Sequence, residues 1–367
     1  MKILLLGEYS NVHWTLAQGL RQLGHEAVVV SNGDGWKNYD RDISLSRNGT
    51  SAISGISYYI KALSTISRLK GFDVVQLINP VFLQLKAERI MPFYKMLRNN
   101  NRTMFMGAFG MDKYWIKAGM DCKTFRYSDF NIGAEIRHSD ENSIFYNDWV
   151  CGTKGKLNDL IAQDCDGIIS GLYEYDASYR PYFPDKLRFI PFPINTEKYT
   201  PRIRKVDNGV IKFFIGIQKH RNQYKGTDIM LRALQRVKAD FPESCEIKIA
   251  ESVPFPEYVK MMNDSHVILD QLYSYTPAMN ALQAMAQGLI AVSGGEPENY
   301  EILGEDELRP IVNVQPTEKS VYQELIKLIR EPSLIEKLSR QSIEYVRRHH
   351  NHVRVAQRYL DFYQTFL

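Results

Sequence analysis

A short basic segment lies between a strand-like run and a helix-like run of this sequence. The strand-like run covers 211–217, and Lys219, Arg221 and Lys225 follow it before a helix-like run begins at Thr227. The N-terminus of a helix carries unpaired N–H groups and a partial positive charge, so neighbouring basic side chains add to its attraction for anions. This arrangement predicts a diphosphate site in which Arg221 and Lys225 contact the phosphates. A solvated basic loop is the alternative.

Strand-like and helix-like runs alternate along both halves of the chain. Such alternation predicts an α/β fold with two Rossmann-like parallel-sheet domains. The expected strands are 2–7, 26–31, 73–78, 103–107, 167–170 and 187–191 in the first half, and 211–217, 245–250, 266–270 and 290–292 in the second. The expected helices are 14–23, 53–69, 86–98, 155–164 and 173–179, then 227–241, 255–263, 276–287, 319–330, 333–349 and 354–366.

A proline-containing segment separates the two series of runs. Pro191, Pro193 and Pro201 lie in it and stiffen the chain. We therefore expect an N-terminal domain at 1–195 and a C-terminal domain at 196–353. Poor periodicity and many aromatic residues between 110 and 150 predict an irregular, partly helical insertion.

Composition and charge limit the classes of function. The 367 residues carry a net charge of +4 at pH 7, which suits small anionic ligands or an anionic membrane surface and is too weak to indicate nucleic acid. Four scattered cysteines without a Cys-x-x-Cys pair predict reduced thiols and a cytoplasmic location. The apolar run at the N-terminus ends at Glu8, too early for a signal peptide. No run approaches the ~20 apolar residues of a membrane-spanning helix.

Two features of the second half carry a resemblance to a known family. They are the basic segment 219–226 and the run Gln283-Ala-Met-Ala-Gln-Gly288. Together with two Rossmann-like halves, they resemble the retaining glycosyltransferases of family four. The resemblance implies the GT-B fold, in which two domains face a central cleft. It also implies that a nucleoside diphosphate sugar, the donor, binds the C-terminal domain, that the acceptor binds the N-terminal domain, and that helix 354–366 packs back on the latter.

The resemblance assigns donor contacts to residues of the second half. The family has an Arg and a Lys at the pyrophosphate, which Arg221 and Lys225 match by position, with Lys219 a rival for the first role. Gly216 lies at the end of the preceding strand. The remaining residues expected at the donor are Ser252 and Val253 at the base, and Thr276, Pro277, Ala278, Met279 and Asn280 at the sugar and phosphates. Ordinary turns are the alternative, and Thr276 could equally be a helix N-cap.

The chain departs from the family pattern at both signature glutamates. The family's second glutamate, which holds the ribose hydroxyls, is Gln283 here, and the position eight residues earlier is Tyr275. A neutral amide in place of a carboxylate should cost donor binding on the order of 1 kcal/mol or more. Asp270, at the end of an expected strand, could supply a carboxylate from nearby. The departure makes a catalytically degenerate nucleotide-sugar-binding or scaffold protein the alternative to an active transferase.

In the first half, polar residues follow the ends of two expected strands. His13 comes after 2–7, and Asp112 comes after 103–107. Open α/β sheets bind ligands at the carboxyl ends of their strands, so both residues are candidates for the acceptor side of catalysis. The alternatives are a histidine packed on the surface and a helix cap.

The resemblance further implies the reaction. It implies transfer of a hexose to a hydroxyl of a glycan or lipid-linked glycan in polysaccharide or glycoconjugate synthesis, without a metal or other cofactor. Arg221 and Lys225 would stabilise charge on the leaving diphosphate. A peripheral contact with the inner membrane rests on the same analogy. A nucleotide-sugar 2-epimerase would need a carboxylate and a histidine in the cleft. No GxGxxG follows either first strand to indicate an NAD enzyme.

Overall fold

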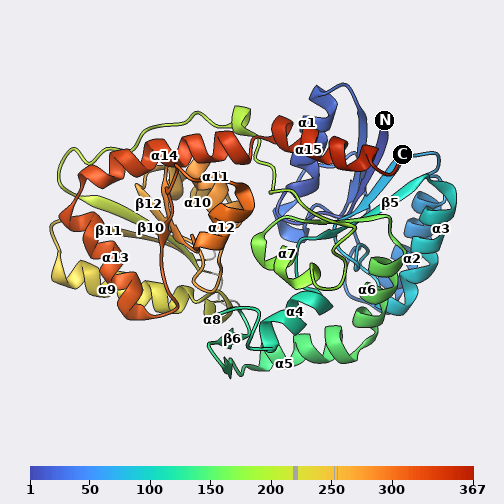
Figure 1. Ribbon diagram of the computed structural model, residues 1–367, viewed down its shortest axis with the longest axis horizontal. Coiled ribbons are helices and arrows are strands. Elements are labelled where there is room, and N and C mark those ends of the chain that lie inside the picture. Colours follow the sequence, from blue (N-terminus) through green and yellow to red (C-terminus); the bar gives the residue numbers. More distant parts are fainter. Residues whose placement is uncertain (218–221, 252, 254) are drawn as a thin grey trace. The chain divides into compact units, whose positions relative to one another are not determined.

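The expected strands form two parallel sheets (Figure 1). The computed structural model describes residues 1–217, 222–251, 253 and 255–367. Its contacts group the chain into two units. Unit 1 comprises Met1–Thr124, Arg137–Asn195 and His352–Leu367, and unit 2 comprises Phe125–Ile136 and Thr196–Asn351. The architecture is therefore α/β with two parallel-sheet units.

The sheet of unit 1 has seven parallel strands in the order β3-β2-β1-β4-β5-β8-β9. They are β1 (Lys2–Leu6), β2 (Glu26–Ser31), β3 (Ile43–Ser44), β4 (Val74–Leu77), β5 (Thr103–Ala108), β8 (Gly167–Ser170) and β9 (Leu187–Phe189). In β1 the four residues from Ile3 to Leu6 are fully buried. Such continuous apolar runs are typical of parallel strands with both faces covered.

Proline position explains where one helix of unit 1 begins. The helices of this unit are α1 (Val12–Gln22), α2 (Ala52–Ile66), α3 (Met91–Asn100), α4 (Lys113–Met120), α5 (Asp140–Tyr146), α6 (Thr153–Asp164), α7 (Tyr173–Tyr179) and α15 (His352–Gln364). The prediction of one helix over 86–98 is wrong at its start, because only a short helical turn occupies Ala87–Arg89. Pro92 lacks an N–H and fits only the first turn of a helix, so α3 begins at Met91.

Helix α15, the last in the sequence, packs against α1 within unit 1 (Figure 1). Gly19 permits the close approach, because a Cβ at this position would lie 2.3 Å from the carbonyl oxygen of His352. Phe105 on β5 makes edge-to-face contacts with Phe362 and Tyr363. The C-terminal residues thus complete the core around the first sheet.

The sheet of unit 2 has five parallel strands in the order β11-β10-β12-β13-β14. They are β10 (Ile211–Ile217), β11 (Cys245–Glu251), β12 (Val267–Leu269), β13 (Ile290–Ser293) and β14 (Val312–Asn313). The helices are α8 (Asn222–Lys225), α9 (Thr227–Asp240), α10 (Phe255–Asn263), α11 (Met279–Ala286), α12 (Pro297–Leu303), α13 (Glu318–Arg330) and α14 (Ser333–His349). The strand side chains of Phe213, Ile215 and Val267 are fully buried in the core of this unit.

A small antiparallel hairpin of unit 2 comes from the first half of the sequence. It consists of β6 (Asn131–Ile132) and β7 (Glu135–Ile136) within residues 125–136. Sequence periodicity could not indicate this grouping, because the partners of the 125–136 segment lie far along the chain. The bond from Arg126 to Tyr275, for example, joins residues 149 positions apart.

Three further findings concern the described residues as a whole. None of their helices combines the length and the apolar content that crossing a bilayer requires. No three His, Cys, Asp or Glu side chains among them are grouped so as to hold a metal ion. The four cysteines are unpaired thiols.

Candidate functional site

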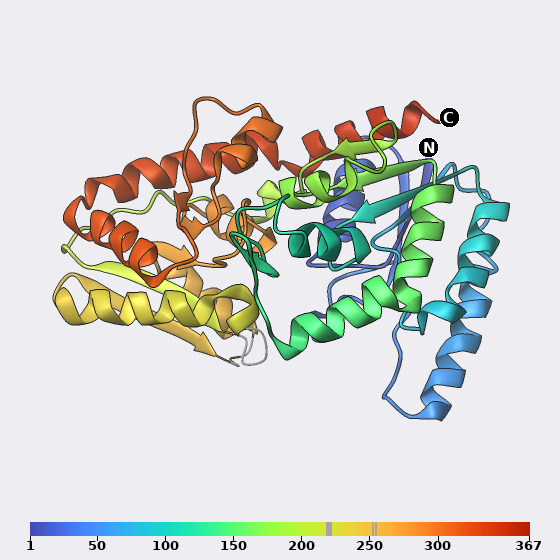
Figure 2. The same cartoon turned by 60° about the horizontal axis from the view of Figure 1, so that its bottom comes forward.

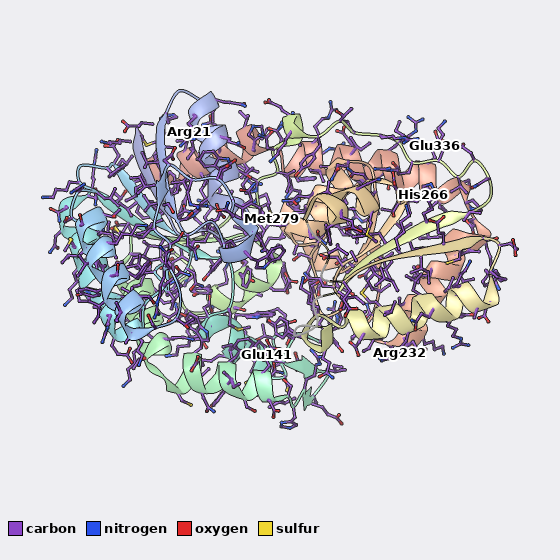
Figure 3. The ribbon with its side chains drawn as sticks, turned by 180° about the vertical axis from the view of Figure 1, so that it is seen from behind. Arg21, Glu141, Arg232, His266, Met279 and Glu336 are labelled. Atoms are coloured by element: carbon purple, nitrogen blue, oxygen red, sulfur yellow. The ribbon has the colours of Figure 1, made fainter. Side chains whose placement is uncertain are left out.

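The strand order of unit 2 changes direction between β10 and β12. From β10 the chain passes to β11 on one side and then to β12 on the other. Open parallel sheets bind ligands outside the carboxyl ends of the strands at such a switch point. These ends are Ile217 and Leu269 here. Figure 3 labels Met279, which begins α11 on the side of the carboxyl ends, and His266, which precedes β12.

Three polar side chains form a connected cluster at this position. Asn280 on α11 donates from Nδ2 to Oδ1 of Asp270 at 3.0 Å, and the hydroxyl of Tyr258 on α10 donates to Oδ1 of Asn280 at 3.0 Å. Gly216 lies against the ring of Tyr258, where a Cβ would come within 2.9 Å of Cε2. The cluster therefore connects the ends of β10 and β12 to the first turn of α11.

Asp270 has one carboxylate oxygen without a partner. The residue is 5% exposed, and its Oδ2 accepts no hydrogen bond from any described residue. The hydroxyl of Ser274, in the same loop, is also buried and equally without a partner in the described part of the chain. An unsatisfied buried polar group costs about 1–3 kcal/mol, and a charged one costs more. The loop after β12 therefore offers two polar atoms that a ligand or an ordered water would satisfy.

The N-terminus of α11 is suited to an anion. Its N-cap is Ala278, whose side chain has no oxygen to accept the first N–H groups, and its first turn, which starts with Met279 and Asn280, contains no acidic residue. The alternative considered for Thr276, a helix N-cap, is wrong, because the helix starts at Met279 and its N-cap is Ala278. The first N–H groups and the helix dipole of α11 favour a phosphate at this end.

The start of α9 approaches the loop that follows β12. The N–H of Leu272 donates to the carbonyl of Lys225 at 2.9 Å. Gly226, the N-cap of α9, has a φ of 71°, and a Cβ there would lie 2.7 Å from Cβ of Leu272. Both the positive φ and the close contact require glycine. The half-buried Lys225 is thereby held beside the loop that contains Asp270 and Ser274.

Some of the predicted donor residues cannot be placed in this geometry. Those outside the described residues are Lys219, Arg221 and Ser252. Val253 is half-buried. Gln283 is also half-buried, one turn beyond Asn280 on α11, and its carbonyl accepts Nε2 of Gln287 at 2.9 Å. The proposed contacts of these residues with a nucleotide stay predictions.

Tyr275, at the position of the family's first glutamate, anchors the 125–136 hairpin segment. Its side chain is buried, and its hydroxyl accepts the N–H of Arg126 at 2.7 Å. The guanidinium of Arg126 lies over its ring at 4.8 Å from the centroid. The rings of Phe125 and Tyr127 lie 5.7 and 5.0 Å from it, centroid to centroid. Tyr275 thus has a packing role that a glutamate could not fill.

Glu296 forms a second anchor for the same segment. It accepts the hydroxyl of Tyr127 at 2.7 Å and a guanidinium N–H of Arg126 at 2.8 Å. It also accepts the side-chain amides of Asn313 and Gln315 at 2.9 and 2.5 Å. Burial opposes the charge of Glu296, but the hydrogen bonds from Tyr127, Asn313 and Gln315 outweigh it and hold the pKa of Glu296 below its ordinary value. The carboxylate is therefore ionised and fully used within unit 2.

His13 is fully buried at the start of α1 in unit 1. Its Nδ1 lies 2.9 Å from the carbonyl oxygen of Gly7, and its Nε2 lies 3.2 Å from Nε2 of Gln76, whose Oε1 accepts the hydroxyl of Tyr363. Burial lowers the pKa of His13 to about 3, so the ring is neutral, with Nδ1 donating and Nε2 accepting. The surface position is therefore wrong, and His13 connects β1, β4 and α15. A catalytic role stays a prediction.

Asp112 is the N-cap of α4 and is also fully buried. Its Oδ1 accepts the N–H of Trp115 and its Oδ2 accepts the hydroxyl of Tyr179, both at 2.9 Å. Burial raises the pKa of Asp112 to about 7. The geometry matches the helix-cap alternative, because both oxygens accept hydrogen bonds within unit 1. A catalytic role for Asp112 stays a prediction as well.

Two further residues, Glu8 after β1 and Tyr258 on α10, were not predicted as site residues from the sequence. Glu8 follows β1, and its carboxylate oxygens accept the N–H groups of His13 and Trp14 at 3.3 and 2.9 Å. Burial raises the pKa of Glu8 to about 8. An acidic residue directly between a buried strand and a helix is the signal that could have found it. Tyr258 had no such signal, because its hydrogen bond to Asn280 joins α10 to α11 and depends on the tertiary arrangement of these two helices.

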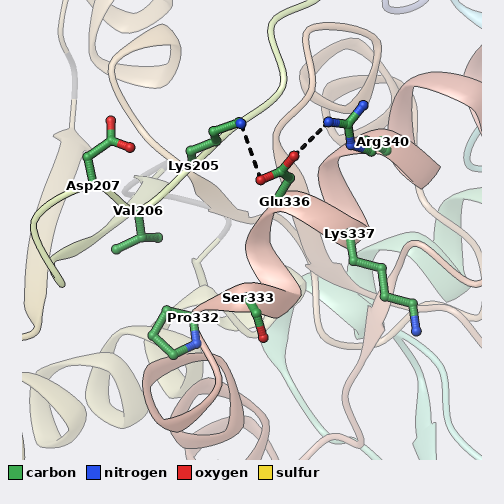
Figure 4. A pocket seen from close by; sticks show the side chains of 8 residues that line it. All are labelled: Lys205, Val206, Asp207, Pro332, Ser333, Glu336, Lys337 and Arg340. Carbon is green, nitrogen blue, oxygen red and sulfur yellow. Dashed lines mark hydrogen bonds and ion pairs between the residues drawn. The ribbon is translucent and has the colours of Figure 1, made fainter.

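A surface pocket of unit 2 lies away from the switch point (Figure 4). Its volume is about 590 Å³. Glu336 on α14 pairs there with Lys205 at 3.4 Å and with Arg340 at 2.6 Å. The pocket opens beside the segment that enters β10, whereas parallel sheets bind ligands at the ends where strands leave. We assign no ligand to it.

Solved structures resemble the chain over its whole length. Sucrose-phosphate synthase from Thermosynechococcus elongatus gives a TM-score of 0.64 at 12% identity, covering 100% of this chain and 99% of that one. The Anabaena protein Alr3699/HepE, solved with UDP and glucose, gives 0.61 at 10% identity, covering 100% of both chains. The fold is GT-B. A Listeria monocytogenes protein that carries the name UDP-N-acetylglucosamine 2-epimerase shares the GT-B fold at a TM-score of 0.54 and 10% identity, covering 98% and 95% of the two chains. No protein-family model and no curated protein sequence matches the chain.

Proposed function

We propose that this GT-B protein is a glycosyltransferase that takes its sugar from a nucleoside diphosphate sugar bound to unit 2. The observation that carries the proposal is the unsatisfied Oδ2 of Asp270, held next to Asn280 at the switch point of the sheet. A buried acceptor of this kind suits a hydroxyl of a sugar or ribose. The UDP complexes of proteins with the same fold support the nucleotide part of the proposal.

The diphosphate would lie at the N-terminus of α11. The helix dipole and the first N–H groups of α11 favour the phosphates, and Lys225 adds a full positive charge from the start of α9. We infer that these groups stabilise the charge that develops on the leaving diphosphate, without a metal ion and with retention at the anomeric carbon. Arg221 and Lys219 would join them, and Gln283 would bond a ribose hydroxyl.

The acceptor and the location are proposed more generally. We propose a hydroxyl of a glycan or lipid-linked glycan as acceptor, in the synthesis of a polysaccharide or glycoconjugate. Four unpaired cysteine thiols suit a reducing compartment, which supports a cytoplasmic location.

A nucleotide-sugar-binding protein without turnover is the second candidate. The observation that favours it is the buried Tyr275, whose hydroxyl and ring hold the 125–136 segment where the family has a carboxylate. Gln283 replaces the other signature carboxylate. A 2-epimerase is less well supported, because it would need a histidine in the cleft, and His13, the acceptor-side candidate of unit 1, is buried and engaged on both ring nitrogens.

Binding and turnover distinguish these candidates. Thermal unfolding would be measured with UDP, GDP, ADP and their sugars, since a ligand at a hundred times its Kd stabilises the folded protein by about 2.7 kcal/mol. Lys225→Ala should lose the stabilisation, whereas Lys205→Ala, an exposed lysine of the same unit, should keep it. Hydrolysis of the matching donor, followed by NMR of the released sugar, supports the transferase and its retention. Binding without hydrolysis supports the second candidate, and no stabilisation by any nucleotide contradicts both.

A further inference from the structure

Helix α2 exposes a stripe of large apolar side chains. We call it the α2 stripe, and its members Ile53, Ile56, Ile60 and Leu63 are 80%, 59%, 61% and 42% exposed. Their spacing of three and four residues places all four on one side of the helix. Contiguous exposed apolar surface of this kind marks an interaction site in a folded protein.

The opposite side of α2 already has its partners. Tyr58, Ala62 and Ile66 are buried in the core of unit 1, and the helix contacts α3 beside it (Figure 2). The N-cap Ser51 accepts the N–H of Ser54 at 3.1 Å, so the helix has a defined start. The orientation of α2 is therefore fixed by its buried side, and the α2 stripe must point outward.

The stretch of sequence that contains the α2 stripe is rich in basic residues. Residues 47–102 contain nine basic and two acidic residues, a net charge of +7, although the whole chain has only +4. Helix α2 contains no acidic residue. Lys61, Arg68 and Lys70 are exposed on and just beyond it. A second copy of this chain would bring the same positive charge and be repelled, whereas a partner with an apolar interior and an anionic surface would be attracted.

We propose that α2 docks unit 1 on the surface of an anionic lipid bilayer. With 15 residues the helix is about 22 Å long, too short to span a bilayer and suited to lie in the interface. The α2 stripe would enter the acyl region, and Lys61, Arg68 and Lys70 would meet the anionic headgroups. This docking does not depend on glycosyl transfer, because it uses a helix that contributes no residue to the nucleotide site of unit 2.

Vesicle sedimentation tests the proposal with the full chain and with lipids that contain no sugar acceptor. The protein should bind vesicles of phosphatidylcholine with phosphatidylglycerol, bind vesicles of phosphatidylcholine alone much more weakly, and lose binding as salt increases. The double variant Ile56→Gln/Ile60→Gln should lower the partition coefficient by about tenfold or more, because two apolar anchors are lost. Ile144→Gln is the matched control, since Ile144 on α5 of unit 1 is 60% exposed, and it should bind as wild type.

A second variant removes charge and leaves the α2 stripe intact. Lys61→Gln/Arg68→Gln should weaken binding to anionic vesicles by about tenfold or more and leave binding to phosphatidylcholine vesicles unchanged. Circular dichroism checks that both double variants fold, as expected for exposed positions and a good helix-forming residue. Absence of vesicle binding by the wild type, or equal binding by the wild type and Ile56→Gln/Ile60→Gln, would overturn the proposal. So would a dimer in sedimentation velocity that Ile56→Gln/Ile60→Gln dissociates, since the α2 stripe would then contact a second copy.

Discussion

Replacement of Asp270 by asparagine tests whether its carboxylate serves a ligand or the fold. In the protein, Oδ1 accepts a bond from Asn280 and Oδ2 accepts none from the described residues. Asparagine has the same size, and its oxygen can keep the bond to Asn280. Because Asp270→Asn removes a buried charge and keeps that bond, we expect the free energy of unfolding to stay within about 1 kcal/mol of wild type or to rise.

Nucleotide binding should change in the opposite sense. A hydrogen bond to a charged group contributes about 1.5–3 kcal/mol, and one between neutral groups contributes about 0.5–1.5 kcal/mol. Asp270→Asn should therefore weaken binding of the nucleoside diphosphate sugar that stabilises the wild type by about 1–2 kcal/mol, which raises Kd about 5- to 30-fold. Isothermal titration calorimetry at one salt concentration measures this change. Asp264→Asn is the control, because the Asp264 side chain is 60% exposed on the same unit, and its Kd should equal that of wild type.

Two results would refute this reasoning about Asp270. An unchanged Kd for that nucleoside diphosphate sugar would show that Oδ2 contacts neither its ribose nor its sugar. A loss of more than about 2 kcal/mol in the free energy of unfolding, measured by urea denaturation, would show that the carboxylate supports the fold.

Three further predictions concern stability. Gly226→Ala should lower the free energy of unfolding by about 2 kcal/mol or more in urea denaturation, because the new Cβ is strained by the positive φ and crowds Leu272. Gly209→Ala is the control, since Gly209 has a similar φ of 74° but open space around it, and it should cost only about 1 kcal/mol. Equal costs for the two variants would show that the contact between Gly226 and Leu272 is not rigid. Tyr275→Phe removes the acceptor of the Arg126 N–H, so the free energy that holds the 125–136 segment in place should fall by about 1 kcal/mol. Limited proteolysis should then cleave this segment severalfold faster than in the wild type, and an unchanged rate would contradict the role of Tyr275. Burial raises the pKa of Glu8 from its ordinary value of 4.5 to about 8. Between these two pH values the folded protein keeps a proton that the unfolded chain releases, so the contribution of Glu8 to stability falls as pH rises. Glu8→Gln should remove that fall, so its stability relative to wild type should increase between about pH 5 and pH 8.5 in urea denaturation, and a constant difference would contradict the raised pKa.

The positions of the strands were largely predictable from the sequence. β2, β8 and β10 have the bounds that their apolar runs indicate, because a parallel strand buried on both faces is one continuous apolar run. Helix starts were less predictable. The apolar spacing around Pro92 continues across residues that are not helical, and the backbone restrictions of proline decide where α3 begins. Helix α11 likewise begins later than predicted, at Met279.

The candidate site was predictable only where strand ends determine it. Asp270 and Gly216 could be found because each stands at the end of an expected strand of one parallel sheet. Tyr258 could not be found, because its hydrogen bond to Asn280 joins two helices whose relative position no local sequence pattern indicates. The role of Tyr275 was hidden for a related reason, since its partner Arg126 lies 149 residues earlier. Interactions at such separations arise from tertiary packing and leave no periodic signal.

The order of the segments has a consequence for synthesis on the ribosome. Unit 1 includes α15, which follows all of unit 2 in the sequence, and the 125–136 segment can dock only once Tyr275 and Glu296 of unit 2 have been made. At about 5–20 residues per second, synthesis of the segment between β5 and α15 takes about 12–50 seconds. During that time the first sheet lacks the helix that packs on α1, and its Phe105 lacks the rings of Phe362, Tyr363 and Phe366. Neither unit can complete its native contacts domain by domain as the chain emerges, so synthesis of α15 is the step that allows unit 1 to close its core.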